Sequence, residues 1–192
     1  MGISLVKGQK ISLAKDSGEL SKVVMGLGWD PAKKKGFFGF FKKTDPIDLD
    51  ASCCLFDESK NPVDMVWFRQ LKSRDGSIIH TGDNLTGDGE GDDEQIIVDL
   101  TKVPAHVKYL VFTVNSFRGQ TFNEVDNAYC RLVDSATQKE MARYSLSGGG
   151  NYTAMVMAKL YRHQGEWKMH ALGDPANGQV IEQLLSVMVA TL

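Results

Sequence analysis

Short runs of apolar residues, many of them alternating with polar ones, recur along this chain between Gly, Pro, Asn or Asp. Alternation places successive side chains on opposite faces of an extended chain, which is the pattern of strands that bury one face. The runs lie roughly 8–15 residues apart, a spacing typical of antiparallel β proteins. We expect strands over residues 23–29, 49–56, 64–71, 77–81, 95–100, 109–116, 128–133, 142–146, 152–161 and 167–172.

The two ends of the chain carry further signals. Apolar residues alternate in segments 3–5 and 11–13, on either side of Gly8-Gln9, and predict an opening hairpin. Apolar residues in segment 181–192 recur at helical spacings, so we expect the chain to close with one amphipathic helix.

One further helical turn is expected over residues 101–106, where Pro104 suits the start of a helix. Helices and strands do not otherwise alternate, which argues against a parallel doubly wound sheet. Two antiparallel sheets that bury their inner faces against each other are the simplest arrangement left. With no internal repeat or linker, the sequence predicts a mainly β, two-sheet antiparallel sandwich with one C-terminal helix, in a single domain over residues 1–192.

Composition and charge narrow the class of protein. Of 192 residues, 42% are hydrophobic and 24% charged, which fits one globular domain with a sizeable core. The net charge of −2 gives no sign of binding to nucleic acid. No apolar run reaches the roughly 20 residues of a membrane-spanning helix, and the first ten residues lack the features of a secretory signal.

The three cysteines fit a reducing compartment. Cys53 and Cys54 are adjacent, so in a strand they point to opposite faces and do not readily pair with each other. None of the three, including Cys130, has the spacing of a Cys/His metal site. We expect a cytoplasmic protein whose thiols are structural.

The most informative segment is the acidic loop, defined here as residues 82–94. Six carboxylates lie between Asp83 and Glu94, with no Lys or Arg among them. The rest of the chain has 22 basic and 18 acidic residues, a net charge of +4, so the negative charge is concentrated in this loop. Carboxylates held close together raise one another's pKa and destabilise a fold unless a cation or solvent separates them.

A bound hard cation would explain the acidic loop. In extended geometry Asp88, Glu90, Asp92 and Glu94 lie on one side, and the intervening glycines leave backbone oxygens accessible. Ca²⁺ prefers about six to eight such oxygen ligands. The spacing does not match an EF-hand or a P-loop. The alternative is a solvated acidic turn.

Three more acids could complete a composite site with this loop. Asp48 and Asp50 share one face of an expected strand, while Leu49 between them faces the other way. Asp30 closes the preceding strand. Taken singly, each of these acids is more commonly a turn or capping residue.

Three motifs, taken together, resemble one known family. They are Gly26-Leu27-Gly28-Trp29-Asp30, Asp48-Leu49-Asp50-Ala51-Ser52, and the acidic loop from Gly82-Asp83-Asn84 to Asp92-Asp93-Glu94. Over nearly the whole chain this combination resembles the TerD family of tellurite-resistance and stress proteins. Segments 112–117 and 122–131 are similar to its TerZ branch in particular.

The resemblance implies a cytoplasmic, bacterial, Ca²⁺-binding β-sandwich that acts in resistance to tellurite, other chemical stress, phage and colicins. We expect its metal-loaded face to recruit other tellurite-resistance proteins or a membrane-bound stress complex. So many acids suggest two Ca²⁺ ions. The expected metal-binding residues are Asp30, Asp48, Asp50, Asp83, Asn84, Gly87, Asp88, Gly89, Glu90, Asp92, Asp93 and Glu94.

The chain departs from shorter family members by an insertion at residues 31–47. Five lysines there flank four phenylalanines, which are Phe37, Phe38, Phe40 and Phe41. The rings could enter the headgroup region at the inner face of the cytoplasmic membrane while the lysines meet anionic lipid. Alternatively, the rings cover the end of the sandwich and the lysines are solvated.

No catalytic motif is recognisable, and the four histidines are scattered along the chain. The three tryptophans are expected to anchor the core. We therefore expect a binding protein rather than an enzyme. The alternative is a Ca²⁺- or Mg²⁺-dependent phosphoesterase that uses the clustered carboxylates to hold a metal that activates water.

Overall fold

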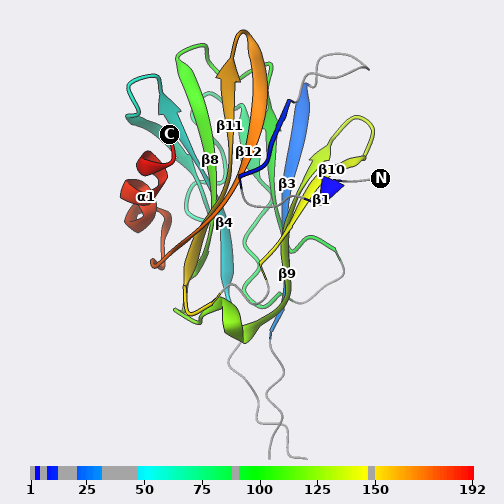
Figure 1. Cartoon of the computed structure of the whole chain (residues 1–192), viewed down its shortest axis with the longest axis vertical. Coiled ribbons are helices and arrows are strands. Elements are labelled where there is room, and N and C mark those ends of the chain that lie inside the picture. Colours follow the sequence, from blue (N-terminus) through cyan, green and yellow to red (C-terminus); the bar gives the residue numbers. More distant parts are fainter. Residues whose placement is uncertain (1–2, 5–7, 13–20, 32–46, 88–90, 147–149) are drawn as a thin grey trace, which may run out of the picture.

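Two six-stranded sheets lie face to face in the computed structural model of the chain (Figure 1). It describes residues 3–4, 8–12, 21–31, 47–87, 91–146 and 150–192. The elements, in chain order, are β1 (Ile3–Ser4), β2 (Lys10–Ser12), β3 (Lys22–Pro31), β4 (Leu49–Asp57), β5 (Pro62–Val66), β6 (Ile78–His80), β7 (Glu94–Asp99), β8 (Val107–Ser116), η1 (Phe122–Glu124), β9 (Val125–Asp134), β10 (Glu140–Ser145), β11 (Ala154–His163), β12 (Glu166–Ala176), η2 (Ile181–Leu184) and α1 (Leu185–Ala190).

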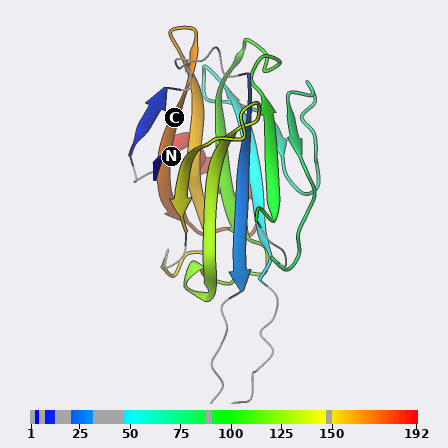
Figure 2. The same ribbon diagram turned by 90° about the vertical axis from the view of Figure 1, so that its right-hand side faces the viewer.

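The strand order is β1-β10-β9-β3-β7-β6 in the first sheet and β2-β12-β11-β8-β4-β5 in the second. Neighbouring strands are antiparallel, except that β1 runs parallel to β10. Views at right angles show the two sheets as separate layers (Figures 1 and 2). The expectation of a mainly β, antiparallel two-sheet sandwich is confirmed.

Alternation along the strands builds the core between the sheets. Val23, Met25 and Leu27 of β3 are buried and belong to the same cluster as Leu49 and Leu55 of β4. The pattern that predicted the strands is thus the pattern that fills the space between the sheets.

A second, smaller apolar cluster covers the outer face of the second sheet. Ile181, Leu184 and Met188 are fully buried there against residues of β4, β8 and β11. The predicted C-terminal helix is present but shorter than expected, as a 3₁₀ turn followed by the six-residue helix α1. Its apolar stripe packs on the sheet, as the helical spacing predicted.

The cysteines and tryptophans are core residues. Cys53 packs between the sheets and Cys54 packs on the outer face, so the two thiols lie on opposite sides of β4. All three cysteines are buried and free, and burial raises the pKa of Cys54 and of Cys130 to about 12. Such thiols are un-ionised and behave as small apolar side chains.

The predicted opening hairpin is wrong. The segments on either side of Gly8 join different sheets, since β1 pairs with β10 and β2 pairs with β12. The Gly8 amide donates to the Ala171 carbonyl, which holds the connection against β12 instead of closing a turn. A short alternating run carries no information about which distant strand it will join.

The helical turn predicted over residues 101–106 is also wrong. Two separate reverse turns occupy the segment, closed by hydrogen bonds from Lys102 to Asp99 and from Val107 to Pro104. None of the helices in the described part of the chain has the length and apolar character needed to cross a bilayer.

Candidate metal centre

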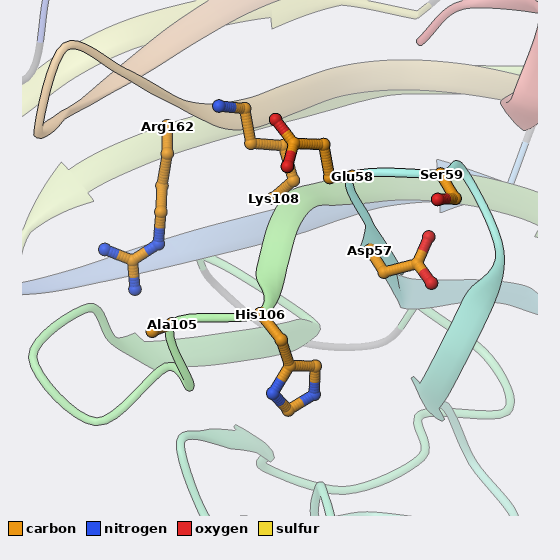
Figure 3. Close-up of a pocket in the computed structure, with 7 residues that line it drawn as sticks. All are labelled: Asp57, Glu58, Ser59, Ala105, His106, Lys108 and Arg162. Carbon is orange, nitrogen blue, oxygen red and sulfur yellow. The ribbon is translucent and has the colours of Figure 1, made fainter.

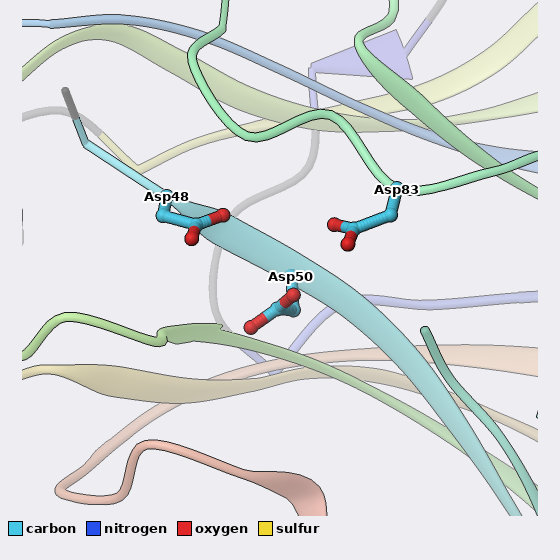
Figure 4. A group of neighbouring side chains, drawn as sticks. All are labelled: Asp48, Asp50 and Asp83. Atoms are coloured by element: carbon cyan, nitrogen blue, oxygen red, sulfur yellow. The ribbon is translucent and has the colours of Figure 1, made fainter. Parts of the chain in front are cut away.

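Three carboxylates converge at one end of the sandwich, and we call them the acidic cluster: Asp48, Asp50 and Asp83. Asp48 and Asp50 flank Leu49 at the start of β4, and Asp83 comes from the loop that follows β6. One carboxylate oxygen of each residue lies within 4.8 Å of the others (Figure 4). The strand and the loop thus present their acids to a common space.

Burial makes the charged forms of Asp48 and Asp50 energetically unfavourable. Asp48 and Asp50 are each 3% exposed. Burial, with smaller contributions from Glu94, Asp48 and Asp83, raises the pKa of Asp50 to about 8. Burial and Asp83 raise the pKa of Asp48 as well. Carboxylates so placed would gain from a cation among them.

The protein supplies little compensation of its own. The side-chain nitrogen Nδ2 of Asn115 donates a hydrogen bond to Asp50 Oδ2 at 2.9 Å. Arg118 Nε lies 3.5 Å from Asp48 Oδ2, on a side chain that is 42% exposed. Asp48 Oδ1 is buried and has no hydrogen-bond partner among the described residues. Three carboxylates, one of which has a buried oxygen without a hydrogen-bond partner among the described residues, provide the oxygen ligands that a hard divalent cation such as Ca²⁺ prefers.

Glu94 connects the two segments that carry the cluster. Its Oε2 accepts a hydrogen bond from the Ala51 amide at 2.7 Å, and its Oε1 accepts one from the Asn84 amide at 3.1 Å. Ala51 follows Asp50 and Asn84 follows Asp83, so Glu94 fixes the distance between strand and loop. Burial raises the pKa of Glu94, while its hydrogen bonds oppose that rise.

His80 supports Glu94 from the inner face of β6. Its Nε2 lies 3.3 Å from Glu94 Oε2, and its Nδ1 accepts a hydrogen bond from the Gly82 amide. An acceptor at Nδ1 places the proton of a neutral imidazole on Nε2, facing the carboxylate and the Ala51 carbonyl. Both side chains are fully buried, so this pair is part of the support for the cluster.

Asn84 and Gly87 shape the acidic loop. Asn84 Oδ1 accepts hydrogen bonds from the Thr86 and Gly87 amides, and its Nδ2 donates to Asp93 Oδ1. Gly87 has φ +67, and a side-chain carbon there would overlap the indole of Trp29. Both residues therefore act on the loop's conformation in the described structure.

Asp92 and Asp93 make other contacts. Asp92 forms a two-point ion pair with Arg131 of β9, at 2.7 and 3.0 Å, on the outer face of the first sheet. Asp93 Oδ2 accepts a hydrogen bond from the Trp29 amide. Glu94 points inward, so Asp92 and Glu94 do not share one side as extended geometry predicted. The chain bends at Asp93, between the two residues.

The remaining predicted ligands lie apart or outside the described residues. Asp30 is exposed and accepts a hydrogen bond from Asn127. Asp88, Gly89 and Glu90 lie outside the described residues, as do the four phenylalanines of the insertion. The structure thus brings together three of the predicted acids, with Glu94 and Asn84 as near neighbours.

Three residues that support the site were not singled out from the sequence: His80, Asn115 and Arg118. His80 follows the apolar Ile78 by two positions, so alternation alone would place it inside the sandwich. Asn115 is a polar residue in the apolar strand β8, and it lies directly across from Asp50. Arg118 lies beyond the strand end, where the sequence gives no comparable signal.

Comparison with known proteins agrees with this architecture. The sequence model of the TerD domain matches residues 1–187. The chain is 51% identical to the tellurium resistance protein TerZ of Serratia marcescens, covering 99% of this chain and 98% of that protein. It is 44% identical to the stress response protein SCP2 of Bacillus subtilis (strain 168), covering 97% and 98%.

A solved structure shows the same fold. It is the crystal structure of a homologue of the telluride resistance protein TerD from Streptomyces coelicolor A3(2), which superposes with a TM-score of 0.73 at 20% identity. The match covers 86% of this chain and 95% of that chain. The names of the matched relatives are those of resistance and stress proteins rather than of enzymes.

Proposed function

The chain belongs to the TerD family of tellurium-resistance and stress proteins, close to TerZ, and we propose that it is a Ca²⁺-dependent interaction module without catalytic activity. In this proposal the protein works in the cytoplasm during tellurite or other chemical stress. Its metal-loaded end recruits a partner, either another tellurite-resistance protein or a membrane-bound stress complex.

The acidic cluster carries the proposal. Asp48, Asp50 and Asp83 would hold the ion through carboxylate oxygens, with Asp48 Oδ1 as the oxygen that lacks a partner among the described residues. When bound, Ca²⁺ would supply positive charge and further coordination positions for water or backbone oxygens. Glu94 and His80 would keep the strand and the loop at the separation that the ligands need.

Exposed apolar side chains beside the cluster support the interaction role. Leu85, two residues beyond Asp83, is 51% exposed, and Phe117 is 40% exposed. The Phe117 amide donates to the Asp48 carbonyl at 2.9 Å, so its backbone is tied to a ligand residue. Fixing Asp83 against Asp48 would also fix the loop that carries Leu85. Cation occupancy and the shape of this surface are thereby linked.

The second Ca²⁺ ion and the membrane contact are part of the proposal. Asp88 and Glu90 would be the source of ligands for a second ion. The insertion's Phe37, Phe38, Phe40 and Phe41 would meet the partner or the inner face of the membrane.

Calorimetric titration with Ca²⁺, repeated with Mg²⁺, tests the cluster directly. The wild-type chain should bind Ca²⁺ and discriminate against Mg²⁺, which demands a tighter octahedral geometry. Asp50→Asn keeps the shape of the side chain and removes its charge. It should weaken binding by more than about 100-fold, since even residues that support ligands account for roughly 10–100-fold.

Glu182→Gln is the matched control, because it removes one negative charge from an exposed position on the C-terminal 3₁₀ turn. It should leave Ca²⁺ affinity unchanged. Equal affinity in Asp50→Asn and wild type would refute the assignment of the cluster. Loss of affinity in both variants would point to a general effect of net charge instead.

A further inference from the structure

A basic groove lies on the outer face of the second sheet, far from the acidic cluster. Its volume is about 340 Å³, and its walls include Lys10 of β2, Tyr109 of β8, and Lys159 and Tyr161 of β11. No Asp or Glu is among its lining residues in the described part of the chain. Since the whole chain has a net charge of −2, this concentration of positive charge is local.

Strand register explains how the basic side chains meet. Lys159 of β11 lies directly across from His170 of β12, and His170 lies directly across from Lys10 of β2. Next to this row, Tyr161 lies across from Tyr109 of β8. Lys10 and Lys159 lie on either side of His170, and repulsion between their ammonium groups is a cost that a bound anion would offset.

The Lys159 side chain is held in place before any ligand arrives. Its ammonium lies 5.8 Å from the ring centroid of Tyr161 and 5.9 Å from that of Tyr109, and it donates a hydrogen bond to the Thr191 carbonyl. Burial, followed by repulsion from Lys10 and Lys60, lowers the pKa of Lys159. The ammonium is therefore placed near two aromatic rings, in a groove whose described lining includes no Asp or Glu.

His170 and Lys10 complete the row. Burial and the charges of Lys159 and Lys10 lower the pKa of His170. Lys10 is exposed and makes no ion pair with any described residue. One ammonium is thus fixed and a second is accessible, with an imidazole between them.

Acidic residues lie in the neighbouring hollow. That hollow has a volume of about 320 Å³ and shares Lys108 and Arg162 with the groove. Figure 3 shows Asp57 and Glu58 at one side of it and Arg162 at the opposite side. Arg162 donates to the Val103 carbonyl at 2.8 Å and forms part of the wall. An anion would therefore bind on the side of Lys159.

We propose that this groove binds an organic phosphate, with the phosphate at Lys159, His170 and Lys10 and the organic part against the rings of Tyr109 and Tyr161. A doubly charged oxyanion matches several converging cations better than a single carboxylate does. The groove lies in the volume range of small-molecule sites and is larger than a bare phosphate requires. The aromatic rings provide the apolar wall for the remainder of the ligand.

The groove and the acidic cluster are separate sites. Tyr109 and Asn115 are six positions apart on β8, which is about 20 Å at the rise of a β-strand, and Asn115 lies across from Asp50. Phosphate binding in the groove therefore does not depend on the Ca²⁺ proposal. The Asp50→Asn variant should bind the same phosphate with wild-type affinity.

Phenyl phosphate, phenol and inorganic phosphate are the probes, titrated into the full chain by calorimetry. Phenyl phosphate should bind more tightly than either fragment, because it alone contacts both the cations and the rings. Lys159→Gln should weaken it by about tenfold or more, the value of one hydrogen bond to a charged group. Lys10→Gln should also weaken it, and this exposed position leaves folding intact.

Lys102→Gln is the matched control, since Lys102 is 63% exposed and pairs with Asp99 elsewhere on the surface. Unchanged affinity in both Lys159→Gln and Lys10→Gln, or equal binding of phenol and phenyl phosphate, would overturn the proposal. Vesicles of phosphatidylcholine with and without phosphatidic acid identify the source of the phosphate. Binding to the phosphatidic acid vesicles that Lys10→Gln weakens would support the same chemistry with a lipid headgroup as its source.

Discussion

The sandwich has two sets of carboxylates, Asp92 alone and the acidic cluster, and their ionic and hydrogen-bonding partners differ. Asp92 is met by Arg131 through two hydrogen bonds at 2.7 and 3.0 Å, and Tyr129 and Gln95 donate to it as well. In the acidic cluster Arg118 Nε lies 3.5 Å from Asp48, on a side chain that is 42% exposed. Asp92 thus has a close two-point cationic partner, whereas the acidic cluster has a single, longer contact with a cation.

The difference shows how an acid's role follows from what the chain places beside it. A buried carboxylate with a two-point guanidinium partner is satisfied and holds strands together. Buried carboxylates without such a partner raise one another's pKa, and an external cation would stabilise them. Sequence position does not separate the two cases, because Asp83 and Asp92 belong to the same acidic loop.

The largest expected effect is a pH dependence that Ca²⁺ removes. The pKa of Asp50 is about 8 in the folded chain and ordinarily 3.8. A raised pKa means that the folded state binds the proton more tightly. The associated stability is fully present below about pH 3.8 and is lost as the pH rises through about 8. Without Ca²⁺, the free energy of unfolding should fall by up to about 4 kcal/mol from pH 5 to pH 8.

Urea denaturation at the two pH values, with a chelator or with Ca²⁺, measures this effect. Ca²⁺ should restore stability at pH 8, and Asp50→Asn should flatten the pH profile without the metal. A profile that stays steep in Asp50→Asn would assign the titration to other groups, such as Glu94, whose pKa burial also raises.

A smaller effect is expected from giving the acidic cluster a cation of its own. Asp83 is exposed, so Asp83→Lys can place an ammonium beside Asp48 and Asp50 without displacing core atoms. The variant should be more stable than wild type by about 1.5–3 kcal/mol at pH 8 in the absence of Ca²⁺, the value of a hydrogen bond to a charged group. Ca²⁺ should no longer stabilise it.

Asp83→Asn is the comparison for that variant, because it removes the negative charge without adding a positive one. Its stability without Ca²⁺ should lie between those of wild type and Asp83→Lys. Thermal melts with and without Ca²⁺ measure all three. Continued stabilisation of Asp83→Lys by Ca²⁺ would mean that the ion binds elsewhere.

Much of the fold followed from alternation, because burial of one sheet face is a local property of the sequence. The strands around Val23, Leu49 and Leu110 were predicted for this reason. Pairing is not local, and the predicted hairpin at Gly8 failed because its two arms join different sheets. Which strands become neighbours depends on contacts between residues far apart in the chain.

In the candidate site too, the local features could be predicted from the sequence and the contacts between distant residues could not. Asp48 and Asp50 could be placed on one face of a strand by counting alone. The separation of Asp92 from Glu94 could not, because it depends on the bend at Asp93 between them and on Arg131, which is 39 residues beyond Asp92. Arg131 can be recognised as the partner of Asp92 only once the pairing of β3 with β7 and β9 is known.

The smallest expected effects on stability come from removing the arginine that contacts each set of carboxylates, Arg131 beside Asp92 and Arg118 beside Asp48. Asp92's side chain is 1% exposed, so Arg131→Gln leaves a buried charge without its two-point partner. Loss of a fully buried partner costs about 3–5 kcal/mol. Because Arg131 is 30% exposed and Tyr129 and Gln95 remain, we expect about 1–2 kcal/mol here, with unchanged Ca²⁺ affinity.

Arg118→Gln is the matched change at the acidic cluster. Its exposed, longer contact should cost less than about 1 kcal/mol of stability, and removal of a competing cation from Asp48 should strengthen Ca²⁺ binding. Urea denaturation and calorimetry on both variants check the pair. Tighter Ca²⁺ binding in Arg131→Gln would show that Asp92 contributes to the metal site, and the division between the two sets would then fail.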